Sequence, residues 1–258
     1  MVEIAAVRFK GGRRLGKFHS MVNPQREISP GAYAVNKITP AMLAGAPGIE
    51  EVAPAFIDFI KGSCLCSYNS EFDMGFLYQE LALAGKHAAS YEQAVRQLHI
   101  VDVLKMARRL MPGLARYPLW FVAQKLGLPK VQEHRALADV ELTLAVFMRL
   151  KDLYTEKGLA GFGHFVSLFG MNAEFLEEVS AGKLAQIQEA LSLGASLRIQ
   201  YLSTTTAAIT QRDVQPLEIK SERNNLYLVG RCRLRNEDRS FKIDNILHLE
   251  IARPQEGS

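Results

Sequence analysis

A histidine and an aspartate lie five residues apart in EHRALADVELT, residues 133–143, a segment that is otherwise apolar and strongly helical. The imidazole of His134 can exchange a proton near neutral pH, and the carboxylate of Asp139 is an ionisable oxygen donor. Five helical residues turn two side chains about 140° apart, so the pair can meet only if His134 precedes the helix and Asp139 lies in an early turn. We expect that arrangement, with Asp139 facing the protein. The plainer interpretation places Asp139 near the free N–H groups of a helix start and leaves His134 exposed in a loop.

A second polar group lies in SYNSEFDMGFL, residues 67–77, where an expected strand ends at Tyr68 and a helix that carries Asp73 begins. The carboxyl ends of strands are where α/β proteins place their sites. In the plainer interpretation Asn69 and Ser70 cap the helix, and Asp73 favours its positive end. The residues themselves leave both interpretations open.

Strands and helices alternate along the first half of the chain. Strands are expected at 2–9, 15–24, 63–68 and 99–102, and helices at 48–62, 69–85, 103–113, 118–128 and 134–156. This alternation predicts an α/β domain with both sheet faces covered. Residues 157–180 are expected to form a partly helical connector before a short helix at 181–194. Nearly every later segment has a strand pattern, which predicts a small β-rich module.

Composition is ordinary for a globular protein. The chain has 258 residues, 48% apolar and 22% charged, and a net charge of +4 that is compatible with a polyanionic partner. Cys64, Cys66 and Cys232 lack metal-ligand spacing and predict a reducing cytosol. The sequence has no apolar run long enough to span a bilayer and no signal-peptide pattern, so we expect a cytoplasmic protein without a membrane partner.

Taken together, NSEFD, VDVLKMARRLMPG and HRALADVELT resemble the DEDDh family of 3′→5′ exonucleases, which includes the epsilon subunit of bacterial DNA polymerase III and ribonuclease T. The resemblance extends from residue 2 to about residue 152 and implies a ribonuclease-H-like mixed sheet flanked by helices. In this family two Mg²⁺ or Mn²⁺ ions are held by four carboxylates during phosphodiester cleavage. By this resemblance Asp73 and Asp139 are metal ligands and His134 is the general base. Nucleic-acid contacts are expected from four residues, Asn69, Phe72, Arg108 and Arg109, although the two arginines are also typical of a solvated helix face.

One motif of that family is absent from this sequence. The Asp-x-Glu motif of the family's first strand supplies the other two carboxylates, whereas Met1 already stands where the family is in its second strand. Glu3 matches a glutamate that the family carries in addition to the motif. We therefore expect the first strand to be missing, backbone groups on its neighbours to be unpaired, and nuclease activity to be impaired. Either the gene start is misplaced, or the chain is a degenerate nuclease that binds without cutting.

The C-terminal part resembles a different family. Residues 198–219 and 224–244 are similar to the WYL domain, a small Sm-like β-barrel of bacterial regulators that senses nucleic acid or nucleotide-like ligands. The naming triplet is altered to Leu226-Tyr227-Leu228, and Asn245 stands where that family often has arginine. Cationic side chains beside an aromatic ring suit a ligand with a phosphate and a base. The expected ligand residues are Tyr201, Arg212, Arg231 and Arg239, and the alternative is a charged outer face of the barrel.

These features predict an exonuclease-like α/β domain at 1–155, a linker at 156–182 and a WYL-like β domain at 183–258. The predicted function is a metal-dependent 3′→5′ exonuclease that acts on single-stranded DNA or RNA ends and is impaired in this chain. The alternative is a non-catalytic protein that binds nucleic acid or a nucleotide. Expected partners are single-stranded DNA or RNA and a polymerase or repair protein.

Overall fold

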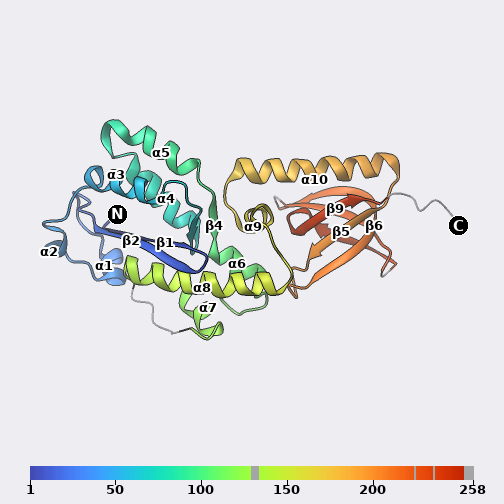
Figure 1. Ribbon diagram of the computed structural model, residues 1–258, viewed down its shortest axis with the longest axis horizontal. Coiled ribbons are helices and arrows are strands. Elements are labelled where there is room, and N and C mark those ends of the chain that lie inside the picture. Colours follow the sequence, from blue (N-terminus) through green and yellow to red (C-terminus); the bar gives the residue numbers. More distant parts are fainter. Residues whose placement is uncertain (129–133, 224, 235, 253–258) are drawn as a thin grey trace. The chain divides into compact units, whose positions relative to one another are not determined.

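The computed structural model describes residues 1–128, 134–223, 225–234 and 236–252 (Figure 1). The chain divides into two compact units. The first contains Met1–Arg108 and Ala115–Leu153, and the second contains Arg109–Leu114 and Tyr154–Ser258. Within the described ranges, the helices are all too short or too polar to cross a membrane.

The first unit begins with an antiparallel hairpin of β1 (Glu3–Lys10) and β2 (Arg13–Met21). Gly11 and Gly12 connect the strands, and both have positive φ, at 57° and 81°. Two-residue hairpin turns of this kind need a left-handed backbone at both positions, which glycine adopts without steric cost. The hairpin matches the prediction for this segment.

Two further strands form a separate sheet. β3 (Leu65–Ser67) and β4 (Ile100–Asp102) pair in parallel, and each is followed directly by a helix. Among the described residues β1 pairs only with β2, and β3 pairs only with β4. The strands of the first unit therefore form two two-stranded sheets, one antiparallel and one parallel, and not one continuous mixed sheet.

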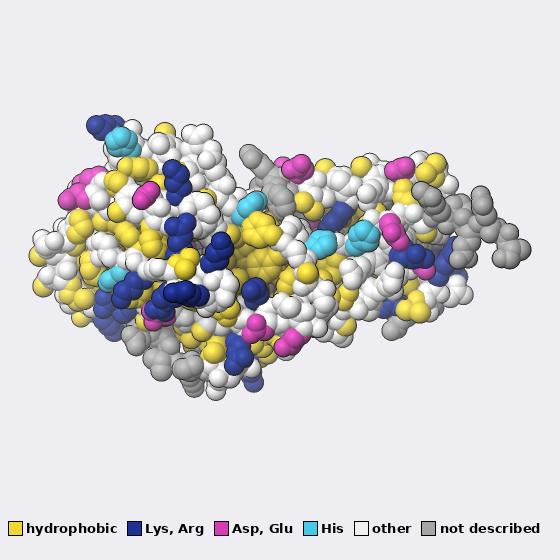
Figure 2. All heavy atoms as spheres, viewed as in Figure 1, with side chains coloured by type: hydrophobic (Ala, Val, Ile, Leu, Met, Phe, Trp, Pro, Cys, Tyr) yellow, Lys and Arg dark blue, Asp and Glu magenta, His cyan; other side chains and the backbone are white. Residues whose placement is uncertain are grey.

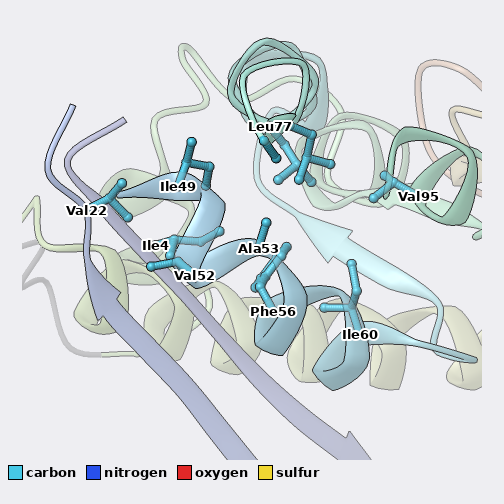
Figure 3. Close-up of a cluster of buried hydrophobic side chains, with 11 residues drawn as sticks. Ile4, Val22, Ile49, Val52, Ala53, Phe56, Ile60, Leu77 and Val95 are labelled. Carbon is cyan, nitrogen blue, oxygen red and sulfur yellow. The ribbon is translucent and has the colours of Figure 1, made fainter. Parts of the chain in front are cut away.

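Helices cover these strands. They are α1 (Pro30–Asn36), α2 (Pro40–Leu43), α3 (Ile49–Ile60), α4 (Ser70–Leu81), α5 (Ala88–Arg96), α6 (Val103–Leu110), α7 (Leu119–Lys125) and α8 (Ala136–Glu156), with a 3₁₀ turn at Gly85–His87. The core brings together Ile4 of β1, Phe56 of α3, Leu77 of α4 and Val95 of α5 (Figure 3). Apolar residues of α3 recur every three or four positions, so one face of this helix is buried. This core connects the hairpin with α3, α4 and α5.

The second unit packs two helices with an antiparallel sheet. Its elements are α9 (Phe162–Phe169), α10 (Ala173–Leu193), β5 (Leu197–Leu202), β6 (Ile209–Glu222), β7 (Asn225–Cys232), β8 (Glu237–Lys242), a 3₁₀ turn at Ile243–Asn245, and β9 (Ile246–Ile251). The strand order is β8-β7-β6-β5-β9. Ile187 of α10 packs on Ile199, Leu228 and Phe241 of the sheet. This unit therefore has its own hydrophobic core.

Two expectations for the second unit need correction. Among the described strands β8 and β9 each have one neighbour, so the expected Sm-like barrel is present as an open five-stranded sheet. The helix expected at 181–194 begins earlier, at Ala173, and part of the expected connector is therefore α10. The glycines of the expected connector all precede Ala173, so residues 173–180 hold no glycine that would interrupt the helix.

Candidate active site

The turn between β3 and α4 places Asp73. Asn69 has a left-handed backbone with φ of 66°, and its side chain forms no capping hydrogen bond. Its backbone N–H donates instead to Asp102 Oδ1 at 3.1 Å. The buried hydroxyl of Ser70 donates to the carbonyls of Ser67 and Val101, both at 3.1 Å. The side-chain caps considered for Asn69 and Ser70 are thus replaced by bonds that tie the start of α4 to both strands.

Asp73 lies in the first turn of α4 and accepts a hydrogen bond from the hydroxyl of Ser67 at the end of β3. Although Asp73 lies at the surface, partial burial of its carboxyl group raises its pKa. The hydrogen bond from Ser67 acts in the opposite direction, and the negative charges of Asp102 and Asp139 raise the pKa further. Three carboxylates therefore interact electrostatically at the ends of β3 and β4 and at the start of α8.

Asp139 lies in the first turn of α8, where its N–H donates to the Arg135 carbonyl at 2.9 Å. Its Oδ1 atom is inaccessible to solvent, so the carboxylate faces the protein. The negative charge of Asp139 is one of the causes that raise the pKa of Asp73, although burial is the largest cause. The expected position of Asp139 in an early helical turn agrees with this placement.

His134 precedes α8 and is exposed, with a left-handed backbone of φ 54°. Within the described part of the chain, no hydrogen bond or ion pair holds its ring. The structure therefore brings Asp73 and Asp139 together and leaves the imidazole on the loop side of the helix start. Residues 129–133, which include Glu133 of the segment discussed above, lie outside the described residues.

Two acidic residues of this region had no predicted role. Asp102 ends β4, is buried, and accepts hydrogen bonds from Leu104 N at 2.8 Å and Lys105 N at 3.4 Å at the start of α6. Its position between a strand and a helix in IVDVL was the available signal. Glu3 of β1 accepts hydrogen bonds from residues at the start of α8, 132 and 133 positions away. No local pattern could reveal that long-range contact.

The expected nucleic-acid contacts occupy different environments. The side chain of Phe72 is 61% exposed, and its ring lies 4.9 Å from that of Phe76, one turn further along α4. Arg108 is exposed, whereas Arg109 belongs to the second unit and donates to the Asp244 carbonyl at 3.4 Å. Burial lowers the pKa of Arg109. The two arginines thus differ in environment. Figure 2 shows Lys and Arg side chains gathered on the visible face of the first unit.

The metal site expected from the resemblance is incomplete in these residues. Carboxylate oxygens are the ligands that Mg²⁺ and Mn²⁺ prefer, and Asp73 and Asp139 supply two such groups. The neighbouring Asp102 is committed, because its Oδ1 already accepts three backbone N–H groups. The described part of the chain holds no group of three or more His, Cys, Asp or Glu side chains arranged to bind a metal ion. The residues present therefore do not fit a two-metal centre, and Asp73 and Asp139 form a carboxylate pair instead.

The second unit contains a cavity of about 600 Å³ beside the β5–β6 connection. It is lined by Tyr201, Ser203, Thr204, Thr205, Thr206, Thr210, Arg212, Glu237, Asp238, Arg239, Ser240 and Phe241. Three of the four predicted ligand residues are among them. Arg231 is not, and its Nε donates to Asn236 Oδ1 at 3.2 Å. The buried Asn245 donates to the Leu202 carbonyl at 2.8 Å, so it supports the strand that leads into the cavity.

The chain belongs to an exonuclease family, because the family model described as RNase_T: Exonuclease matches residues 1–147, more than half of its length. A second family model, the WYL domain, matches residues 182–251. Both resemblances noted in the sequence are thereby confirmed. The first unit carries an exonuclease domain, and the second contains a WYL domain.

Relatives include polymerase subunits. The DNA polymerase III PolC-type of Thermotoga maritima is 33% identical over 159 residues, which are 62% of this chain and 11% of that protein. The DNA polymerase III subunit epsilon of Aquifex aeolicus is 31% identical over 163 residues, 63% of this chain and 77% of that subunit. Among solved structures, Exonuclease X in complex with 5′ overhanging duplex DNA has 29% identity and a TM-score of 0.44, and the match covers 62% of this chain and 86% of that one. This chain thus spans about a tenth of the length of the PolC-type polymerases. The match therefore does not assign the activity of a whole polymerase to this chain.

Proposed function

We propose that this chain is a DEDDh-type 3′→5′ exonuclease that removes nucleotides from single-stranded DNA ends and works slowly. The observation that carries the proposal is the placement of two carboxylates at helix starts: Asp73 lies in the first turn of α4, after β3, and Asp139 lies in the first turn of α8 with its Oδ1 atom inaccessible to solvent. A structural ion pair would match opposite charges, whereas two nearby carboxylates raise each other's pKa and are a feature of functional sites. The slow rate follows from the incomplete set of metal ligands among the described residues.

His134 takes the proton-transfer role in this proposal. Hydrolysis of a phosphodiester needs a water molecule that loses a proton, and the exposed imidazole of His134 has a ring nitrogen that can accept it. In the exonuclease family divalent metal ions supply Lewis-acid chemistry, but we assign no step to them here, because the described residues do not form their site. Ser67 orients the Asp73 carboxylate through its hydroxyl.

Single strands would be held by the aromatic pair on α4. Phe72 and Phe76 are 61% and 41% exposed, and Phe72 directly precedes Asp73. Exposed rings stack on nucleobases without selecting among them, as proteins that bind single strands require. A single-stranded end laid on these rings would bring a phosphate toward Asp73. Exposed Arg108, over the ring of Tyr117 at 6.0 Å, adds positive charge in this unit.

The direction of cleavage tests this proposal. The full chain is incubated with Mn²⁺ and single-stranded DNA labelled at the 3′ end or at the 5′ end, and with an RNA of the same sequence. We expect early loss of the 3′ label and a ladder of shortened 5′-labelled products on DNA. Internal cuts, or release of the 5′ label first, would contradict a 3′→5′ exonuclease.

A second candidate function is binding without cleavage. It is favoured by the observation that the described residues form no group of three or more His, Cys, Asp or Glu side chains that could hold a metal ion, where a two-metal centre needs several carboxylates. A pure binder would retain labelled single-stranded DNA in a mobility-shift assay equally well with EDTA and with Mn²⁺, and no shortened product would form. The same incubation thus separates the two functions.

For the second unit we propose a ligand that carries a phosphate, bound in the cavity beside Tyr201. Arg212 supplies a cationic group, Arg239 supplies a second one that pairs with Glu237 at 2.7 Å, and the hydroxyls from Ser203 to Thr206 supply further donors. The ring of Tyr201 packs edge-on against Phe241 at 5.2 Å, so one wall is aromatic. Among the residues that the structure describes, Arg212 donates to the neutral Thr210 hydroxyl, at 3.2 Å, and has no carboxylate partner, so it is suited to an anionic ligand.

Substitution of Arg212 by alanine is expected to weaken binding of dTMP to the full chain by about tenfold or more, since a charge-assisted hydrogen bond contributes roughly 1.5–3 kcal/mol. Calorimetric titration with dTMP measures the change, and thymidine, which lacks the phosphate, is the matched ligand. Arg231→Ala is the matched variant, because Arg231 does not line the cavity and pairs with Asn236. Equal affinities of the two variants would refute the assignment.

We further propose a polymerase or repair protein as the protein partner, because the relatives include DNA polymerase III chains. Such a partner would place this chain in the cytoplasm. Co-purification of the full chain with a replicative polymerase from a lysate, compared with the Arg14→Ala variant as a surface control, would test the partner class.

A further inference from the structure

Glu3 connects the first strand of the chain to the helix that carries the candidate site. Its Oε2 accepts hydrogen bonds from Arg135 Nε at 3.1 Å and from the N–H of Ala136 at 2.9 Å. Its Oε1 accepts from Arg135 Nη2 at 3.0 Å and lies 2.8 Å from His19 Nε2. Both carboxylate oxygens are thus used, and a bidentate arginine pair of this kind fixes orientation as well as distance.

This carboxylate is buried and ionised. Its side chain is 6% exposed, whereas that of Arg135 is 36% exposed. Burial alone would raise the pKa of Glu3, but the hydrogen bonds from Arg135, Ala136 and His19 lower it below its ordinary value. A negative group at the first N–H of α8 also stabilises the positive end of the helix. Glu3 is therefore a strong anchor for the start of α8.

The anchored residue lies between the two members of the candidate site. Arg135 directly follows His134, and its carbonyl accepts the hydrogen bond from Asp139 N at 2.9 Å. His134 itself has a left-handed backbone, an uncommon conformation that surrounding contacts must maintain. Because Glu3 holds Arg135 and Ala136, it also fixes the backbone that directly follows His134 and the first turn of α8, which carries Asp139.

We propose that Glu3 is a positioning residue, which holds His134 and Asp139 in place relative to Asp73 through Arg135 and Ala136. The role in catalysis rests on the proposed exonuclease function, whereas the role in positioning does not. Glu3 would touch neither the nucleic acid nor the reacting atoms. Its contribution is to keep the two α8-side groups at a constant distance from the carboxylate on α4.

A second link between the same hairpin and α8 offers a matched control. Arg14 of β2 pairs with Glu141 of α8 at 3.1 Å, two residues beyond Asp139. Both of these side chains are nearly half exposed, at 49% and 44%, so the pair contributes little to stability. Glu141→Gln removes a carboxylate that joins the same two elements without touching the network of Glu3.

The first measurement is amide hydrogen exchange in the full chain, followed by NMR. In Glu3→Ala the exchange of the Ala136 N–H is expected to accelerate by about tenfold or more, because a hydrogen bond to a charged group is lost. The exchange of the amides of residues 137–139 should also accelerate. In Glu3→Gln, which keeps an acceptor oxygen, the exchange rates should lie between those of Glu3→Ala and those of the unchanged protein. Glu141→Gln should leave these amides unaffected.

The second measurement is exonuclease kinetics of the same variants with Mn²⁺. Glu3→Ala is expected to lower kcat by about tenfold with KM changed by less than about twofold, because misplaced catalytic groups act on the chemical step and not on binding. Partial recovery of kcat in Glu3→Gln is expected. Val95→Ala, in the buried core of the same unit, serves as a variant that loses stability without contacting the network.

The outcomes are separable. Equal exchange of the Ala136 N–H in Glu3→Ala and Glu141→Gln would overturn the proposal, whatever the activity. Accelerated exchange with an unchanged kcat, or an equal loss of kcat in Val95→Ala, would overturn the role in the reaction. If the unsubstituted chain cleaves no DNA, the proposed function fails, and the exchange result alone decides whether Glu3 positions the start of α8.

Discussion

Replacement of Asp139 by asparagine is expected to reduce the rate of 3′-nucleotide release by a factor on the order of 100, as removal of one electrostatic group from an active site typically does. The amide keeps the size of the side chain and removes its charge. Asp139 faces the protein at the start of α8 and interacts with Asp73, so the substitution leaves one carboxylate of the pair. Single-turnover assays on 3′-labelled DNA measure the change.

The matched control is Asp58→Asn, an exposed position on α3 outside the site. Equal rates for the two variants would contradict a role of Asp139 in cleavage. NMR titration of the Asp73 carboxyl group provides a readout that needs no activity. Loss of the negative charge of Asp139 should lower the pKa of Asp73, which stays above its ordinary value because burial is the larger cause.

Substitution of Gly230 by alanine is expected to destabilise the second unit by about 1–3 kcal/mol or more, because added volume has no room to enter a packed site. A Cβ at this position of β7 would lie 2.6 Å from the Gln215 carbonyl oxygen and 2.5 Å from Val214 Cγ1. The backbone oxygen belongs to β6, which has an irregularity of register between Pro216 and Glu218. The strands must separate to admit the methyl group.

Gly182→Ala is the control for this substitution. Gly182 lies within α10, and a Cβ there would meet no atom within 4 Å. Alanine favours a helix over glycine, so this variant should be neutral or slightly more stable. Calorimetric unfolding of the full chain compares the two. A lower melting temperature for Gly182→Ala than for Gly230→Ala would contradict this account of the β6–β7 contact.

The positions of those residues of the candidate site that depend on the local sequence pattern could be predicted. Asp73 follows a strand and opens a helix, and Asp139 falls in the first turn of a long apolar helix, so their types and spacing were sufficient. Tyr201, Arg212 and Arg239, which were predicted to bind a ligand, all line one cavity, and their role as ligand residues stays a prediction. In each case the position of the side chain is determined by the helix or strand that carries it.

The remainder depends on contacts between distant residues. Nothing near Glu3 indicates that it binds Arg135, and nothing near Arg109 indicates that its guanidinium turns to the Asp244 carbonyl. The extent of α10 was underestimated because the glycines of residues 157–170 suggested a connector that continues to residue 180, whereas α10 begins at Ala173. The open sheet of the second unit also depends on whether β8 and β9 meet, which strand patterns do not specify.

The division of the first unit into two small sheets bears on how the protein behaves at high concentration. Along the side of β1 that faces away from β2, the described residues provide no strand partner. An edge strand of this kind can pair with the extended backbone of another molecule. Natural proteins usually prevent such pairing with lysine, proline or a β-bulge in the edge strand. β1 has Arg8, Lys10 and an irregularity of register between Arg8 and Phe9 at its far end, but Ile4 to Val7 is uncharged. The tendency of the protein to associate at high concentration therefore depends on which polypeptide segment covers Ile4 to Val7.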